Sequence, residues 1–402
     1  MKKLLLLYCI VALFATCTVS CTGNDEDQPS PYKKIELSDE TRAVVTNANE
    51  FAFDYFTKVS TDIGDENVVI SPLSVTTALS MLANGDKGES REAILKMFGF
   101  AENPEGLDRL NEYSKVLLEN LSIVDSSTKC GLANSVWSGS HSLVPDFEAA
   151  MKNVYNAESK NVSPAGVEGQ NAINFWIEDK TNGVIRDFIK EPLMCDFAVI
   201  NAIYFKGKWK EQFDEDATRK EEFSNIDGSK SEVEMMHLTQ KSIDCSVDDN
   251  AILATLKYGN GNFEMVAILP VNKDGFDDLI VNLKERYTEM LENCHFYTVD
   301  VSFPKFSSSS KFDAIGYLTD MGLHPESEFN SIYNEPLYIN MILTGVSVSM
   351  DEHGTEAAAV TMPGMVTAPG RLYNLEFNRP FIYLIRETST GAILFMGKVV
   401  KF

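Results

Sequence analysis

The sequence predicts a single α+β domain, because helical patterns dominate its first half and strand patterns its second. Apolar residues recur between Phe51 and Phe56 at the spacing of one helical face. By contrast, 197–205 is almost continuously apolar, as in a strand that is covered on both sides. Helices followed by antiparallel strands are typical of α+β folds, and no repeat or second linker interrupts 41–402.

In the first half, the clearest helix signal follows a short apolar strand at 68–70. Ser71 can cap a helix and Pro72 can occupy its first position. A later helix has a good stop signal at Asn182-Gly183. We therefore expect helices over 48–56, 72–82, 107–121 and 171–180.

In the second half, Gly259-Asn260-Gly261-Asn262 lies between two apolar runs, which predicts a β-hairpin. The serine run 307–310 predicts a loop. Strands are expected over 197–205, 252–256, 265–269, 299–303, 346–350, 372–377, 381–385 and 393–400.

The N-terminus has the layout of an export signal, with a positive start, an apolar run over 4–14 and small residues before Cys21. Val19-Ser20-Cys21 resembles the lipobox of bacterial lipoproteins, which predicts a signal peptide at 1–20 and acylation of Cys21. Cleavage of an ordinary signal peptide is the alternative. The acidic, proline-containing stretch that follows predicts a flexible tether over 21–40. We expect an outer-membrane lipoprotein, exported across the inner membrane, whose orientation and exposure at the cell surface stay open.

Composition and motifs argue against nucleic-acid binding, cofactor binding and catalysis. The net charge is −24, whereas nucleic acid needs a basic surface. The five histidines form no HExxH motif, and neither GxSxG nor GxxxxGK occurs. Asp351 and Glu352 are neighbours, so on a strand they would point to opposite faces and could not act as a pair. We expect no catalytic residue, no metal ligand and no cofactor.

Four cysteines remain beyond Cys21, and none has a CxxC partner, so no zinc or redox motif is present. Single buried thiols are the favoured interpretation and a disulfide is the alternative. These cysteines are Cys130, Cys195, Cys245 and Cys294.

The most informative stretch is 351–361, Asp-Glu-His-Gly-Thr-Glu-Ala-Ala-Ala-Val-Thr. It resembles the proximal hinge of the serpin reactive loop, which has an acidic pair, a glycine, Thr-Glu and small residues. The resemblance covers about 45–402. Further serpin-like segments follow in the family's order, at 67–74 (ending Ser-Pro-Leu-Ser), 201–209 (Asn-Ala-Ile-Tyr-Phe-Lys-Gly-Lys-Trp), 235–237 (Met-Met-His), 377–381 (Phe-Asn-Arg-Pro-Phe) and 395–397.

This resemblance implies three β-sheets, eight or nine helices and an exposed reactive loop, here about 351–381, on a metastable body. It also implies inhibition by a suicide-substrate route, in which a protease cleaves the loop and forms a covalent acyl-enzyme. The freed segment then enters the central sheet and distorts the protease. The partner is therefore the target protease, and the inhibitor is a monomer that touches a membrane only through its lipid. A non-inhibitory serpin acting as a surface binding or structural protein is the alternative.

The hinge has the composition that insertion requires. Gly354 tolerates the dihedral changes that start insertion. Alternate side chains of a strand share a face, and small uncharged ones can enter a core without a buried charge. The inward face would hold Thr355, Ala357, Ala359 and Thr361, with Glu356 opposite, a pattern that favours inhibition. By resemblance the hinge residues are Glu352, Gly354, Thr355, Glu356, Ala357, Ala358 and Ala359.

The reactive bond is predicted at Thr367-Ala368. Typical family spacing would place it at Ala368-Pro369, but proline after the scissile bond blocks most serine proteases. The loop is also one residue longer than in common members, and Val366-Thr367 is the next choice. A small or β-branched residue there suits elastase-like or subtilisin-like pockets, and papain-type cysteine proteases, which would read Val366, are an alternative.

Two further features of the resemblance affect insertion. Pro363 and Gly364 would weaken an inserted strand, which favours slower insertion and substrate behaviour. The family usually has a histidine where this chain has Thr344, so the polar cluster beneath the opening sheet, the shutter, must be satisfied differently. The resemblance assigns Ser71, Ser74, Asn201 and Thr344 to the shutter, Trp209 to the breach where insertion begins, and Pro380 and Phe381 to the distal anchor of the loop.

Overall fold

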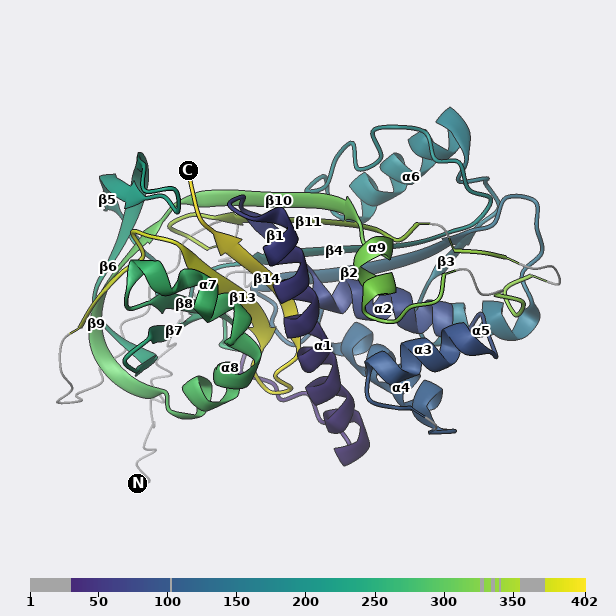
Figure 1. Cartoon of the computed structure of the whole chain (residues 1–402), viewed down its shortest axis with the longest axis horizontal. Helices are drawn as coiled ribbons and strands as arrows, with labels where there is room; N and C mark the ends of the chain where they lie inside the picture. The colour runs from purple at the N-terminus through teal and green to yellow at the C-terminus, as the bar shows by residue number, and fades with distance from the viewer. Residues whose placement is uncertain (1–29, 102, 326–328, 334–336, 340, 355–372) are drawn as a thin grey trace, which may run out of the picture.

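Helices precede most of the strands in the computed structural model, which describes residues 30–101, 103–325, 329–333, 337–339, 341–354 and 373–402 (Figure 1). The longest helix begins where the Ser38 hydroxyl accepts a hydrogen bond from the Thr41 amide (3.1 Å). The α-helices of the described residues are α1 (Asp39–Ile63), α2 (Pro72–Ala83), α3 (Glu89–Met97), α4 (Gly106–Asn120), α5 (Pro145–Asn153), α6 (Gly166–Lys180), α7 (Phe276–Val281), α8 (Leu283–Glu292) and α9 (Ile315–Asp320).

The strands of the described residues form three sheets. One has nine strands, in the order β1-β14-β13-β8-β7-β6-β9-β12, with β5 paired to β6. The others have the orders β3-β2-β4 and β10-β11. The strands are β1 (Val68–Ile70), β2 (Thr128–Trp137), β3 (Glu158–Lys160), β4 (Ala198–Gly207), β5 (Asp214–Ser224), β6 (Lys230–Val247), β7 (Ala251–Tyr258), β8 (Phe263–Pro270), β9 (His295–Pro304), β10 (Phe306–Asp313), β11 (Leu343–Met350), β12 (Tyr373–Glu376), β13 (Phe381–Glu387) and β14 (Ile393–Val399).

The main core lies around the nine-stranded sheet. Every residue of β8 and β14 is buried, as expected for strands that are covered on both faces and therefore apolar throughout. Helices α1, α7 and α8 pack against this sheet (Figure 1). The nine-stranded sheet is thus the stable frame that carries the smaller sheets.

The two smaller sheets meet at an edge without pairing there. Helix α6 covers the β3-β2-β4 sheet, and its Trp176 ring lies 6.4 Å from that of Trp137 on β2, edge to face. In Figure 1, β4 and β11 run next to each other. Among the described residues, however, β4 pairs only with β2 and β11 only with β10. In the part of the chain that the structure describes, β4 and β11 are thus neighbours that belong to separate sheets.

Several expected elements are present. The strand expected at 68–70 is β1, and the predicted hairpin is formed by β7 and β8. Ser71 caps α2, accepting a hydrogen bond from the Ser74 amide at 3.1 Å. The helix expected over 171–180 starts earlier, at Gly166.

The loop predicted over 307–310 is wrong, because these serines lie in strand β10. Every residue from Phe306 to Asp313 is in register with β11. Ser308 is buried, and the Ser310 hydroxyl accepts a hydrogen bond from the Val69 amide (3.0 Å). Serine composition favours loops, but here pairing with β11 satisfies the backbone and small hydroxyls fit beneath the sheet.

The flexible tether predicted over 21–40 also needs a correction at its C-terminal end. Helix α1 already begins at Asp39, and Ile35 is 2% exposed within the main core. The backbone of Lys33 is hydrogen-bonded to Asn262. Residues 33–40 therefore belong to the folded body, because Ile35, although it lies in a polar stretch of sequence, is buried in the main core.

The four body cysteines are free thiols, and Cys130 and Cys245 are buried. Burial raises the pKa of the Cys245 thiol to about 12 and that of Cys294 to about 11. Within the described part of the chain, no helix has the length and apolar character needed to cross a bilayer. The same residues contain no cluster of His, Cys, Asp and Glu suited to a metal ion.

Candidate functional site

Strand β11 ends in a tight turn from Asp351 to Gly354, the start of the predicted hinge. The Asp351 amide donates to the Gly354 carbonyl (2.9 Å), and the Gly354 amide donates back (3.2 Å). The Asp351 carboxylate also accepts from the amides of His353 (2.9 Å) and Gly354 (3.1 Å). The turn therefore binds the carboxylate of Asp351 as well as closing on its own backbone.

Gly354 is required at this position by its backbone and its surroundings. Its φ is +137°, a region that side chains disfavour. A Cβ atom there would lie 2.0 Å from the Gly207 carbonyl oxygen and 2.8 Å from the Trp209 nitrogen. The chain can leave β11 this close to the end of β4 only because no side chain intervenes.

The turn is attached to the end of β4 through Trp209, the predicted breach residue. The Trp209 amide donates to the His353 carbonyl (2.7 Å), and its indole nitrogen donates to the Asp351 carbonyl (2.9 Å). The indole stacks on Tyr258 with 4.3 Å between ring centroids. Trp209 is thus a core aromatic and also the donor that fixes the hinge turn, at the end where the β4 and β11 edges meet.

Glu352 gives the turn a charged attachment that the sequence did not reveal. Its carboxylate pairs with Lys305 (3.0 Å) and accepts from the Thr218 hydroxyl (2.9 Å), with a side chain only 9% exposed. Burial alone would raise the pKa of Glu352, but hydrogen bonds from its own amide, Lys305 and Thr218 hold the pKa below the ordinary value. Lys305 and Thr218 are distant in sequence, and no local pattern marks them.

We expect Glu352→Gln to lower the free energy of unfolding by about 1–3 kcal/mol at pH 7, because it removes a shielded charge-assisted contact. The folded pKa is lowered, so this stabilisation is present above the unfolded pKa near 4.5 and is lost as pH falls through the folded value. Urea unfolding is measured at pH 7 and below pH 4.5. The free energy of unfolding should fall less between these two pH values in the variant than in the unmodified chain. Glu232→Gln, which breaks an exposed pair with Lys220, is the matched control. If Glu352→Gln loses as much free energy of unfolding on acidification as the unmodified chain, the stabilising role assigned to the Glu352 carboxylate is contradicted.

The predicted shutter residues Ser71, Ser74 and Asn201 lie together beneath β4. The Ser74 hydroxyl donates to the Asn201 carbonyl oxygen, and the Ser71 hydroxyl donates to the Leu394 carbonyl (2.8 Å). The side-chain amide of Asn201 donates to the side-chain oxygen of Asn134 (2.6 Å). This network joins α2, β4, β2 and β14. Asn134 was not predicted, because an asparagine inside a strand gives no distinctive signal.

The fourth predicted shutter residue is Thr344. It lies on β11, where alternate residues Thr344, Val346, Val348 and Met350 are buried, and it lies beside the buried phenol of Tyr55. Burial raises the pKa of that phenol. Thr344 thus joins β11 to α1, while Asn134 and Asn201 join β2 to β4.

Of the two distal anchor residues, Pro380 directly precedes β13 and Phe381 begins it. Phe381 is fully buried, with its ring 5.1 Å from Phe303 and 5.5 Å from Phe377. The neighbouring Arg379 guanidinium donates twice to the Pro270 carbonyl, at 3.1 and 2.8 Å. Pro380, also buried, lies between these two attachments. The chain after the reactive loop is therefore fixed firmly to the nine-stranded sheet.

The remaining predicted site residues lie outside the described residues: Thr355, Glu356, Ala357, Ala358 and Ala359 of the hinge, Thr367 and Ala368 of the reactive bond, and Cys21.

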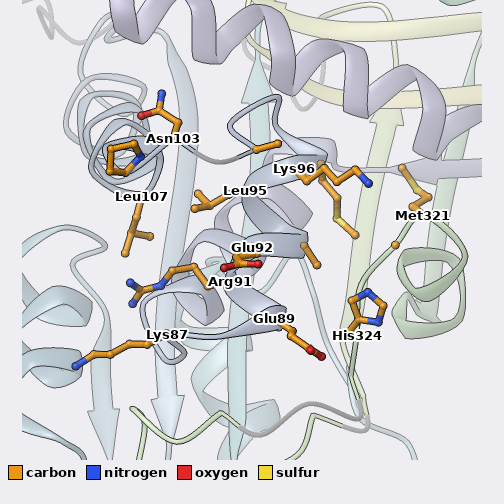
Figure 2. A pocket seen from close by; sticks show the side chains of 15 residues that line it. Lys87, Glu89, Arg91, Glu92, Leu95, Lys96, Asn103, Leu107, Met321 and His324 are labelled. Atoms are coloured by element: carbon orange, nitrogen blue, oxygen red, sulfur yellow. The ribbon is translucent and has the colours of Figure 1, made fainter.

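Among the described residues, an open groove of 1220 Å³ borders α3 and α9 (Figure 2). Lys87, Arg91 and His324 line it together with Glu89 and Glu92. Its mixed charges favour no one ligand class, and Figure 1 places α3 far from β5.

Comparison with known proteins gives a consistent result over nearly the whole chain. A family model described as serpin (serine protease inhibitor) matches residues 46–402. Corticosteroid-binding globulin of Ovis aries is 30% identical over 398 residues, covering 96% of this chain and 89% of that protein. A protein named serine protease inhibitor from Cyanea capillata is 28% identical, covering 88% of this chain and 97% of its own.

Solved structures agree with this fold. Arabidopsis AtSerpin1, described as in its native stressed conformation, superposes with a TM-score of 0.77 at 27% identity, covering 91% of this chain and 99% of that one. The relatives thus include both a protein named as an inhibitor and one named for binding a steroid.

Proposed function

This chain belongs to the serpin family, and from that premise we propose that it inhibits proteases by inserting its cleaved reactive loop between β4 and β11. The observation that carries the proposal is that β4 and β11 lie side by side with no ladder between them among the described residues, and that the hinge turn is attached at the end of β4. The small residues Thr355, Ala357 and Ala359 follow that turn directly in the sequence.

The chemistry proposed needs no catalytic group from this chain. A protease serine attacks the Thr367 carbonyl, the bond to the Ala368 nitrogen breaks, and the acyl group stays esterified to the protease. The freed segment 355–367 can then lie between β4 and β11, where its amides and carbonyls pair with both edges. Because the protease is attached through its ester to Thr367, insertion would carry it along the sheet before water can release it.

We propose an elastase-like or subtilisin-like serine protease as the target, because Thr367 would fill a small pocket and could not offer a charge to a trypsin-like one. Incubation with elastase should give a covalent complex of the two chains that survives SDS. Thr367→Arg should lower the rate with elastase and raise it with trypsin by at least about tenfold, the scale of pocket discrimination. If serine proteases and papain-type proteases all cleave the loop completely and none forms a stable complex with the chain, the proposal that it is an inhibitor is contradicted.

The second candidate is a non-inhibitory binding protein, which the similarity to corticosteroid-binding globulin favours. This candidate predicts loop cleavage without a trapped protease, together with ligand affinity that changes on cleavage. The elastase experiment separates the two, since only an inhibitor retains the protease as an ester.

We also propose that Cys21 carries lipid and that the lipid is the chain's sole membrane attachment. The lipobox-like Val19-Ser20-Cys21 supports this proposal. Replacement of Cys21 by Ser should move the protein from the membrane fraction to the soluble fraction and abolish labelling by a fatty-acid analogue. Unchanged membrane retention would contradict it.

A further inference from the structure

The segment 30–35, here called the strap, crosses from the N-terminus to the turn between β7 and β8. The Lys33 amide donates to the Asn262 side-chain oxygen (3.0 Å), and the Asn262 side-chain amide donates to the Lys33 carbonyl (2.6 Å). Asn262 is fully buried. A single asparagine side chain thus satisfies both backbone groups of Lys33, as a neighbouring strand would.

A second attachment lies two residues further on. Ile35 is buried in the main core, and its amide donates to the Ser389 hydroxyl (3.0 Å). The buried Glu387 carboxylate accepts from Ser389 (2.8 Å) and from Asn262 (3.2 Å). Asn262 and Ser389, the two residues that bind the strap, are therefore joined to each other through the Glu387 carboxylate.

The turn that holds the strap also holds the neighbouring sheet. The Gly259 amide donates to the Lys208 carbonyl beyond the end of β4 (2.8 Å). Asn260 donates through its backbone to Asp125 (3.2 Å) and through its side chain to the Val124 carbonyl (3.0 Å), just before β2. The strap itself reaches this region, because the Ser30 hydroxyl accepts from the Ser126 amide (3.3 Å).

These contacts cross the boundary that insertion would have to open. Sheet β10-β11 is fixed to the nine-stranded frame, since Ser310 binds Val69 of β1 and the Phe306 ring packs 5.4 Å from Tyr383 of β13. A new strand needs about 4.8 Å on each side of it. The β3-β2-β4 sheet must therefore move relative to the frame, while the strap and its turn are attached to both.

We propose that the strap is a clasp, whose contacts with Asn262, Ser389 and Ser126 resist separation of β4 from β11 and so slow loop insertion. This inference rests on the proposed inhibitory function. It assigns a conformational role to a segment that would otherwise serve only as the end of a membrane tether.

The test uses the full-length chain with Asn262→Ala or Ile35→Ala, and Lys34→Ala as the matched control, because the Lys34 side chain is 55% exposed. The uncleaved proteins are incubated at 37 °C, and conversion to an inactive, heat-resistant form is followed by residual elastase inhibition and by melting. Each strap variant should convert at least about tenfold faster, the effect of roughly 1.4 kcal/mol on a barrier. The control should stay within about twofold of the unmodified chain.

A second measurement separates a clasp from general destabilisation. If the strap contacts are lost on opening, Asn262→Ala should lower the melting temperature of the uncleaved protein clearly more than that of the loop-cleaved protein. Equal conversion rates in all variants, or equal melting shifts in both forms, would overturn the clasp while leaving inhibition intact. If the unmodified chain gives no heat-resistant form after cleavage, the proposed function and the clasp both fail.

Discussion

Cleavage of the reactive loop should raise the melting temperature by at least about 20 °C, which corresponds to about 15 kcal/mol in a chain of this size. The inserted segment would pair with β4 and β11 at once, and its inward side chains would be buried. Calorimetry before and after limited digestion of the loop with a metalloprotease, which forms no acyl-enzyme and so cannot be trapped, measures the shift. Mass spectrometry of the digested chain confirms that the cut lies in the loop.

The control for this experiment is an uncleaved sample incubated with the same metalloprotease inactivated by a chelator, and its melting temperature should not change. An unchanged melting temperature after verified cleavage near Thr367 would contradict insertion between β4 and β11. Pro363 and Gly364 bear on the same measurement, because both weaken strand pairing. Pro363→Ala should raise the melting temperature of the cleaved form further.

Thr355→Arg should abolish inhibition and leave a substrate that elastase cleaves completely. Thr355 follows Gly354 directly, so it would be the first inward-facing residue to enter beside Trp209. A guanidinium buried there without a partner would cost several kcal/mol, so that release of the protease by water outpaces insertion. The stoichiometry of inhibition, in moles of inhibitor consumed for each mole of protease, should rise by more than about tenfold.

Glu356→Arg is the matched control, since the same guanidinium would then lie on the opposite, solvated face. It should keep its SDS-stable complex with elastase. If Thr355→Arg still traps the protease as efficiently as the unmodified chain, the inward face has been assigned to the wrong residues.

Local patterns predicted the parts of the site whose geometry depends on neighbours in sequence. Ser71 capping α2 and the hairpin at 259–262 need only turn and cap chemistry. The glycine of the hinge likewise marks a position where the backbone must approach β4 closely. In each case the residue type itself carries the constraint.

Contacts between distant segments were not predictable in this way. Lys305, between β9 and β10, and Thr218, in β5, reach Glu352 from distant parts of the chain, and no local pattern marks either residue. The serines of β10 were misassigned because composition outweighed a pairing partner over thirty residues away. Ile35 was assigned to a tether because a single apolar residue produces no periodicity, although one well-shaped site suffices to bury it.

The place where the strap meets the body also determines where an anchored molecule would work. Ser30 contacts the Asn260 turn, whose Gly259 binds Lys208, and Lys208 is bridged to Gly354 of the hinge. Only eight residues lie between Cys21 and Ser30, so the reach from one to the other is about 30 Å at full extension. With lipid on Cys21, the end of the body that carries the hinge turn would stay within roughly one protease diameter of the bilayer. Proteases confined to that same surface would then meet it at a local concentration that a freely diffusing inhibitor could not reach.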